Sequence, residues 1–241
     1  MPRALCPVLF ALAATLGAAE TVVNDVRIGI GMGPMPDEQE GATYTAPAAI
    51  AGRPATTVYE ETPGLSVVIS GTYGHLAPVG LLIGVQLRST TGEMALKSWQ
   101  HPLGTTYSAD GLEAFSGDTV PGMSFSQTGI AANLGVGWAV TSSVHLELVG
   151  IAGADWTTWD NIANVSANSN LTVQEGQGLG YTVGGRLGAY WTDPETNWQF
   201  GLEGEYTSTT TDFETSYSDV TIESEPVNAG MSVRAVFGHR F

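Results

Sequence analysis

Positive charge and cysteine are scarce in this chain of 241 residues. Lysine occurs once, at Lys97, and eight Lys and Arg residues stand against 24 Asp and Glu, which gives a formal net charge of −16. Nucleic-acid binding is excluded, because contacts to phosphate groups need clustered basic side chains. The single cysteine is Cys6, near the start of the chain, so neither a disulfide framework nor a cysteine metal site is expected.

Long apolar runs are missing as well. The run at residues 8–16 is too short to cross a bilayer as a helix, which takes about 20 apolar residues. It follows Arg3 and precedes the small residues 17–19, a pattern typical of a secretory signal peptide. We therefore predict a signal peptide over residues 1–19, removed together with Cys6, and a single all-β domain over residues 20–241.

What the sequence does contain is alternation with a period of two. In the last fifteen residues, apolar side chains and His239 occupy the odd positions, whereas the even positions are mostly small or polar and include Arg234 and Arg240. Such alternation is typical of a β-strand with one apolar face. The same pattern predicts seven further strands at residues 21–33, 64–74, 79–88, 129–140, 145–156, 181–191 and 197–207.

The predicted strands are joined alternately by long and short connections. The short ones include Asp193-Pro194-Glu195-Thr196, a type I turn signal with proline in the second position. An even number of strands, each long enough to cross a bilayer at a tilt, with short turns at one rim and long loops at the other, predicts an antiparallel up-and-down transmembrane β-barrel of eight strands. The long loops are expected at about residues 34–63, 89–123, 157–178 and 209–226.

The charges inside the predicted strands all fall on one face, which we assign to the lumen. A secreted soluble β-sandwich, the alternative fold, would instead place charge on the outer faces and aliphatic rows inside. We predict that Arg88, Arg186 and Arg234 pair with glutamates in a lumenal network. The residues assigned to this network are Arg27, Arg88, Glu147, Arg186, Glu203, Glu205 and Arg234.

Aromatic residues gather at the ends of the predicted strands. Those beside the short turns, together with Phe241 at the chain end, would form a girdle at the periplasmic interface, and those beside the long loops would form a second girdle. The predicted girdle residues are Tyr73, Trp138, Trp191 and Trp198 at the first interface, and Trp156, Tyr181 and Tyr206 at the second.

The signal sequence, the hairpin rhythm and the final strand ending in Phe241 resemble the small eight-stranded outer-membrane barrels, the family of the outer membrane protein A transmembrane domain and its adhesion and serum-resistance relatives. The resemblance implies export to the bacterial outer membrane and an assembly signal, formed by Phe241, Phe237 and Val233, that the barrel-assembly machinery reads. His239 departs from the family pattern, which has an apolar residue there.

These features favour a structural or surface-interaction role over two alternatives, a narrow channel for small solutes or ions and a secreted soluble sandwich. No enzymatic activity, cofactor or metal site is predicted, because none of the four histidines has the paired base and orienting acid that nucleophilic catalysis requires. Sixteen of the 24 acidic residues fall in the long loops. The expected partners of a monomeric barrel are therefore outer-membrane lipid and lipopolysaccharide, with divalent cations at the acidic loops.

Overall fold

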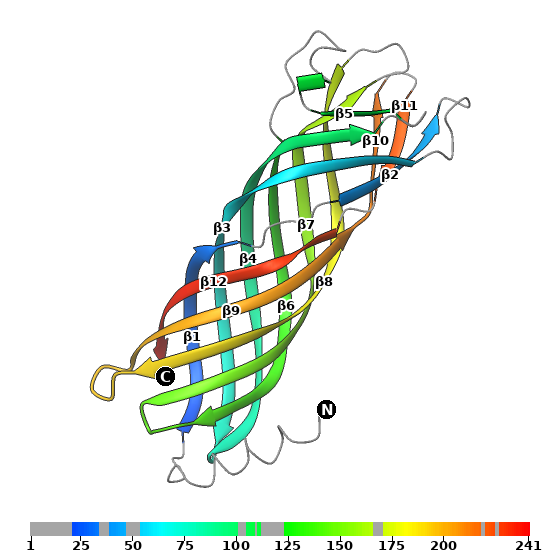
Figure 1. Cartoon of the computed structure of the whole chain (residues 1–241). Helices are drawn as coiled ribbons and strands as arrows, with labels where there is room; N and C mark the ends of the chain where they lie inside the picture. Colours follow the sequence, from blue (N-terminus) through cyan, green and yellow to red (C-terminus); the bar gives the residue numbers. More distant parts are fainter. Residues whose placement is uncertain are drawn as a thin grey trace, which may run out of the picture.

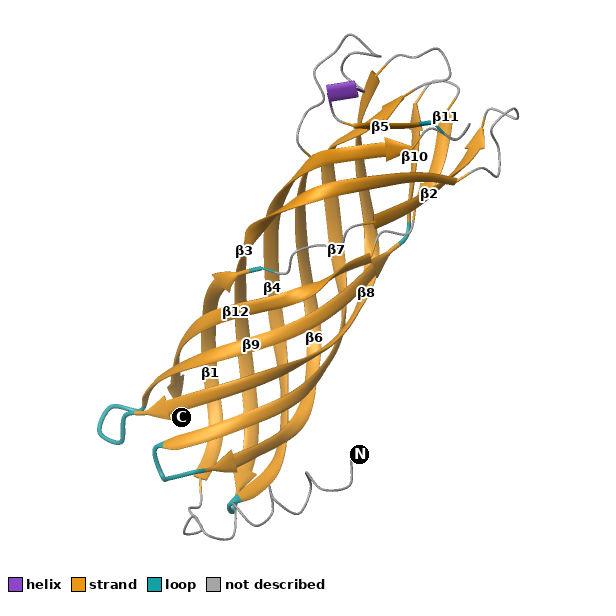
Figure 2. Cartoon of the chain, viewed as in Figure 1, coloured by secondary structure: helices purple, strands orange, loops and turns teal. Residues whose placement is uncertain are grey.

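A computed structural model of the chain shows a single tall barrel (Figures 1 and 2). No helix among the residues it describes is long and apolar enough to cross a bilayer. The predicted signal peptide lies outside the described residues. Those residues are 21–33, 39–46, 54–100, 105–108, 110–111, 123–165, 171–217, 220–224 and 227–241.

The barrel wall is an antiparallel ladder that closes on itself. Every barrel strand pairs with the strand before and after it in the ring, and β1 closes the ring by pairing with both β3 and β12. The predicted fold class, an eight-stranded antiparallel transmembrane barrel, is confirmed. The ring consists of β1 (Thr21–Met32), β3 (Pro54–Leu76), β4 (Val79–Gln100), β6 (Met123–Ala139), β7 (Val144–Val165), β8 (Leu171–Thr192), β9 (Trp198–Thr211) and β12 (Val227–Arg240).

The register fixes the width of the barrel. Arg27 on β1 pairs directly with Gly238 on β12, yet the same row of paired residues, followed around the barrel through β3, returns to β12 at Asn228. The strands are therefore staggered by ten residues, the difference between positions 238 and 228. With eight strands this stagger gives a tilt of about 40° and an interior that side chains can fill.

Short turns join the strands at one rim. The β3–β4 turn contains the cis peptide Ala77-Pro78, and Asn197 closes the β8–β9 turn with φ of 59°, a left-handed conformation that asparagine tolerates. Hydrogen bonds from the Thr196 hydroxyl and the Glu195 backbone N–H lower the pKa of Asp193 below its usual value. The predicted turn at residues 193–196 thus extends by one residue, to Asn197.

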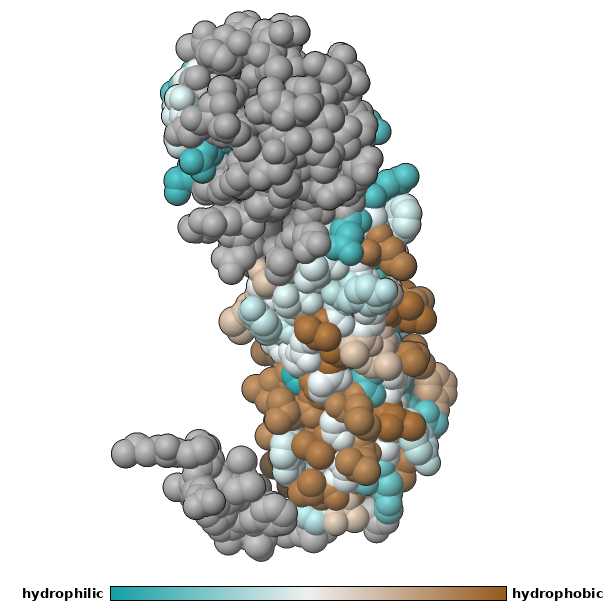
Figure 3. All heavy atoms as spheres, turned by 90° about the vertical axis from the view of Figure 1, so that its right-hand side faces the viewer, coloured by the Kyte–Doolittle hydropathy of each residue, from teal (hydrophilic) through white to brown (hydrophobic). Residues whose placement is uncertain are grey.

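Apolar side chains cover the outside of the lower wall, and mostly polar ones fill the inside. Along β1 and β9 buried and exposed residues alternate, and the exposed ones on β1 include Ile28, Ile30 and Met32. Figure 3 shows this apolar surface over the lower part of the described wall, with a paler, hydrophilic surface above it. Buried charges combined with exposed aliphatic rows are the polarity of a wall surrounded by lipid.

The wall continues above this apolar band, which corrects the predicted long loops. β4 has 22 residues, enough for about 55 Å along the axis, whereas a hydrocarbon core is about 30 Å thick. The apolar–polar alternation is lost there because the outward side chains that the structure describes are mostly polar or small, so periodicity gives no strand signal although the ladder persists. Segments expected as loops therefore contain the upper parts of β3, β4, β7 and β8, and also β2 (Gln39–Ala46), β5 (Thr106–Ser108), β10 (Phe213–Tyr217) and β11 (Val220–Ser224).

An apolar cluster fills the lumen at the rim of the short turns. Val23, Leu76, Leu82 and Ala139 pack together there with at most 5% of their surface exposed. A Cβ atom at Gly137 would contact both leucines, so this glycine gives them the space that they occupy. The sequence places Leu82 on the inward face but gives no sign that an apolar plug lies below the polar lumen.

A charge on the outer wall tests whether lipid surrounds it. Leu134 lies at the middle of the apolar band with 63% of its surface exposed, so Leu134→Arg should lower the free energy of unfolding in lipid vesicles by about 2–4 kcal/mol. The matched control, Thr210→Arg, lies on the outer face of β9 above the band and should cost about 0–1 kcal/mol. Equal, small effects in urea titrations would mean that water surrounds the apolar face.

Candidate functional site

Among the side chains that the structure describes, the lumen holds equal numbers of positive and negative groups. Each arginine lies within ion-pair distance of at least one carboxylate, and nearly all of these groups are fully buried. The described lumenal side chains therefore carry no formal net charge, whereas the whole chain has a net charge of −16. The five arginines are Arg27, Arg88, Arg186, Arg234 and Arg240, and the five carboxylates are Asp25, Glu147, Asp155, Glu203 and Glu205.

An ion pair spans the diameter of the barrel near the short-turn rim. Arg27 on β1 holds Glu147 with two bonds, Nη1 to Oε2 at 2.9 Å and Nη2 to Oε1 at 2.6 Å. β1 and β7 face each other across the ring, four strands apart in either direction. Arg27 also donates to Asp25 at 2.7 Å and to Gln199 at 2.6 Å, so its guanidinium group has partners on three strands.

His145 and Tyr190 complete this lower layer. Their rings stack at 5.0 Å between centroids, and the Arg27 guanidinium lies 3.9 Å from the centre of the Tyr190 ring. His145 Nε2 is 3.1 Å from Glu147 Oε1, and its Nδ1 is 3.2 Å from Arg240 Nη2. Both ring nitrogens of His145 and one face of its imidazole therefore have a partner.

The middle layer is tied to the lower one through Tyr190, whose hydroxyl donates to Glu203 at 2.6 Å. Arg186 lies between the layers, 3.6 Å from Glu147 and 3.7 Å from Glu203, and donates to Gln86 at 3.4 Å. These two ion pairs exceed hydrogen-bond length, so Arg186 is held by charge more than by directed bonds.

Arg234 on β12 completes the middle layer. Its Nη2 donates to Glu205 at 2.5 Å and to Glu203 at 3.3 Å. The predicted partners of Arg186 and Arg234 are therefore the ones that the structure brings to them.

The predicted partner of Arg88 is wrong. Arg88 holds Asp155 with Nε to Oδ1 at 2.7 Å and Nη2 to Oδ2 at 2.5 Å, and it bonds no glutamate among the described residues. The register places Gly129 on β6 between these two residues, and a Cβ atom there would collide with the Asp155 carboxylate. Arg88 also donates to Thr182, and to Thr209 at 3.0 Å on β9, the strand opposite β4.

Sequence reasoning assigned Asp25, Asp155, His145 and Arg240 to the lumen but left them out of the network. It did not single out Tyr190 or Gln199. The sequence feature that could have identified both residues is their place on the inward face, together with the glycines beside them. A Cβ atom at Gly188 or Gly201 would meet the Tyr190 ring, and glycine neighbours of a large inward residue mark the space that it fills.

The predicted girdle residues lie on the outer wall. Tyr73, Trp191, Trp198 and Phe241 are exposed at the short-turn end, where Trp138 is half-buried, and Trp156, Tyr181 and Tyr206 are exposed at the upper edge of the band. Along β8, β9 and β12 neighbouring rings contact one another. This aromatic ladder consists of Trp191, Phe200, Phe237, Trp198, His239 and Phe241.

His239 therefore continues an aromatic surface. Its ring packs edge-on against Trp198 at 5.2 Å and against Phe241 at 4.9 Å. The imidazole takes the place of the apolar residue expected there. Of the predicted assembly signal, Phe237, Phe241 and Val233 all point outward from β12.

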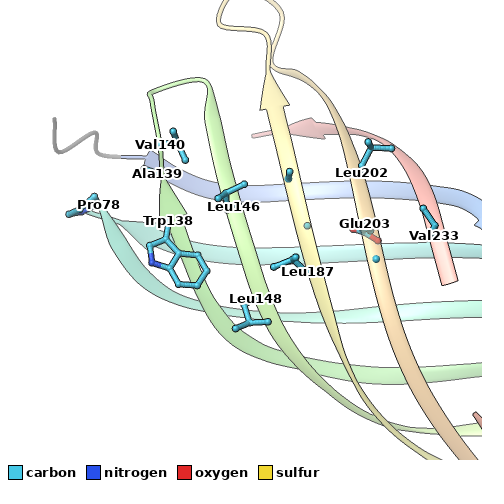
Figure 4. A pocket seen from close by; sticks show the side chains of 13 residues that line it. Pro78, Trp138, Ala139, Val140, Leu146, Leu148, Leu187, Leu202, Glu203 and Val233 are labelled. Carbon is cyan, nitrogen blue, oxygen red and sulfur yellow. The ribbon is translucent and has the colours of Figure 1, made fainter. Parts of the chain in front are cut away.

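The outer wall also has a hollow of about 560 Å³ between the lower parts of β6 and β12 (Figure 4). Leu146, Leu148, Leu187 and Leu202 line it together with small residues such as Gly204. A Cβ atom at Gly204 would meet nothing within 4 Å, so the hollow marks missing side chains on the lipid face. It is a feature of the outside and no part of a path through the lumen.

The fold and the lumen define the class of the protein as a small transmembrane β-barrel with a charged, filled interior. Scans against protein-family models and curated proteins find no match. Among solved structures, the outer membrane protein OprG from Pseudomonas aeruginosa aligns with 92% of this chain and 97% of its own at 14% identity and a TM-score of 0.46.

Two further structures align over similar lengths. The outer membrane protease OmpT from Escherichia coli covers 90% of this chain and 97% of its own at 8% identity and a TM-score of 0.46. Ail, the attachment invasion locus protein of Yersinia pestis, covers 90% and 99% at 11% identity and a TM-score of 0.29. Similarity this low says nothing about function, so the fold assignment rests on the hydrogen-bond ladder of the chain itself.

Removing one partner of the cross-barrel ion pair should be costly. Glu147→Leu leaves Arg27 buried without its two-bonded partner, and the free energy of unfolding should fall by about 3–5 kcal/mol. The double variant Arg27→Met, Glu147→Leu should recover most of that loss, because no unpaired charge remains. Glu175→Gln, which changes an exposed carboxylate on the outer face of β8, is the control and should shift stability by less than about 0.5 kcal/mol.

Tryptophan fluorescence during denaturant unfolding in vesicles measures all three variants. A Glu147→Leu protein as stable as the wild type would show that the pair does not hold the lumen together.

Proposed function

We propose that the protein is a bacterial outer-membrane barrel with a structural or surface-interaction role, and that its lumen does not conduct solutes. The observation that carries this proposal is that side chains from opposite strands meet across the full diameter. Arg27 on β1 bonds Glu147 on β7, and at a higher level Arg88 on β4 bonds Thr209 on β9. A solute would have to break both sets of bonds to pass.

The bilayer placement is supported by the polarity of the wall. The outer faces of the barrel strands carry aliphatic and aromatic side chains across the band, and the formal charges of the band are inside. Closed barrels with this polarity belong to outer membranes. The short turns would then face the periplasm, and the tall upper wall would project from the cell surface.

A non-enzymatic role is part of the proposal. His145, which has an acid beside it, is fully buried and stacked on Tyr190, with Glu147 and Arg240 at its ring nitrogens. A substrate therefore has no access to it. Among the described residues, no group of three or more His, Cys, Asp or Glu has an arrangement that suits a metal ion.

The surface role is supported by the separation of charge. The described side chains of the lumen are neutral in sum, and sixteen of the 24 acids fall in the segments that the sequence predicts as long loops. Strongly acidic loops would attract cations, and divalent cations would bridge their carboxylates to the phosphates of the surrounding lipopolysaccharide. The runner-up function, a narrow channel, would require the cross-barrel bonds to open.

Planar-bilayer recording tests the closed lumen. Because the guanidinium groups of Arg27 and Arg88 reach the opposite walls, the wild-type protein should give no unitary current steps at 100 mV in 1 M KCl, whereas a general diffusion porin in the same bilayer gives steps. Reproducible steps from the wild type, absent from mock preparations, would favour the channel. Heat-modifiable migration of the protein from the outer-membrane fraction tests its placement independently.

The final strand provides a second test. Phe241 is 72% exposed and lies at the end of the aromatic ladder, the position of an assembly signal in the family that the chain resembles. Deleting Phe241 should reduce the heat-modifiable, membrane-inserted fraction several-fold, with the remainder found in the periplasm. Phe241→Trp, which keeps an exposed aromatic ring, should assemble normally. Normal insertion of the deletion variant would count against recognition of this residue.

A further inference from the structure

A recess of about 430 Å³ lies on the outer wall where β3, β4, β6 and β7 leave the apolar band. It is separate from the lumen and from the hollow in Figure 4. Its lining is mixed, with one large aliphatic side chain and several hydroxyls and carboxylates. The side chains that matter are Leu65, Thr91, Glu93, Ser124, Ser126 and Asp160.

Backbone geometry creates the hollow. The β3–β4 register shifts between Thr62 and Leu65, and Gly64 and Gly92 contribute no side chains to the wall between them. The Phe125 ring lies behind Gly92, because a Cβ atom at this glycine would meet the ring, and only 4% of Phe125 is exposed. The floor of the recess is therefore flat backbone supported by an aromatic ring.

The polar side of the recess is an ordered row. Glu93 on β4 pairs in register with Ser124 on β6, which pairs with Asp160 on β7. Both carboxylates are exposed and point outward, on either side of the serine. Neighbouring strands are about 4.8 Å apart, so the backbones that carry the two acids are about 10 Å apart. No Lys or Arg is among the described residues that line the recess.

The recess lies at the height of lipid headgroups. On β3 the outward apolar residue Leu65, 56% exposed, lines the recess and pairs in register with Thr91, and on β7 Trp156 is four residues below Asp160. Four residues at the tilt of this barrel raise the chain by about 10 Å. The headgroup layer begins at the edge of the hydrocarbon core and is about 5–8 Å deep on each side. The recess therefore opens into this layer from its lower edge at Leu65, and its highest carboxylates lie at the outer limit of the layer.

We propose that this recess binds the sugar headgroup of a membrane glycolipid. Carboxylates accept hydrogen bonds from sugar hydroxyls, and the hydroxyls of Thr91, Ser124 and Ser126 both donate and accept. Leu65 and the flat floor suit the C–H face of a sugar ring. The acyl chains of the same lipid lie on the apolar band directly below, with which the recess is continuous, and two carboxylates without a cation disfavour an anionic group.

This inference rests on the outer-membrane placement proposed above. The probe is an N-acylated diglucosamine lipid without phosphate groups, added to the full-length protein in detergent micelles and measured by native mass spectrometry. Phosphatidylethanolamine with acyl chains of the same length is the reference, because its headgroup contains no sugar. The wild type should prefer the glycolipid at least about tenfold, and EDTA should not change this preference.

The double variant Glu93→Gln, Asp160→Asn should lose about tenfold in glycolipid affinity while binding of the reference lipid stays unchanged. The matched control, Glu175→Gln with Asp212→Asn, removes two exposed carboxylates elsewhere on the upper wall and should bind like the wild type. Ser126→Trp, which fills the recess without changing its charge, should also weaken binding. Heat-modifiable migration verifies that each variant is folded.

Three results would overturn the inference. They are equal affinity for the two lipids, unchanged glycolipid binding in the double variant, and loss of binding in EDTA, which would indicate a cation-bridged group instead of a sugar. Failure of the proposed function is distinguishable, because it would appear as absence of the wild-type protein from the outer-membrane fraction. A barrel found in that fraction without a glycolipid preference would contradict this inference alone.

Discussion

Ring closure between β1 and β12 is the constraint on which the rest of the structure depends. Lipid offers no hydrogen-bond partner to a backbone N–H or C=O, so each strand needs a neighbour on both sides. β1 meets this condition by pairing with β3 on one edge and with β12 on the other. Once the ring is closed, its polarity is fixed, because alternate side chains must face lipid and lumen.

The stagger of the closed ring then decides which inward side chains meet. Because the strands are staggered, a row of paired residues climbs around the barrel. Inward side chains at the same height therefore come from strands that are far apart in sequence. Arg27 and Glu147, 120 positions apart, meet because β1 and β7 face each other at the same height. The stagger also places Gly129 between Arg88 and Asp155, where any side chain would separate them.

Much of this could be read from the sequence, and the failures share one physical cause. Period-two alternation located the band parts of all eight strands, and the one-sided placement of charge revealed the lumen. The partner of Arg88 could not be predicted, because Asp155 and the glutamates are all inward and only the stagger chooses among them. The upper strands were missed because a period-two signal requires an apolar outer face, and above the band the described outward side chains are mostly polar or small. His239 looked out of place for an apolar site, yet its ring fits an aromatic ladder.

Several strand registers would keep apolar side chains outside and polar ones inside. The glycines explain why the barrel adopts only one of them. A slip of one residue would turn each inward side chain outward and is excluded by lipid, but a slip of two keeps every face correct. Such a slip would move Arg27 away from Gly238, and Tyr190 away from Gly201, against side chains that fill the same space. Buried ion pairs add little net stability compared with apolar packing, but they penalise a wrong arrangement heavily, since each unpaired charge is costly. Balanced charges and well-placed glycines therefore specify the stagger, which the alternating pattern alone leaves open.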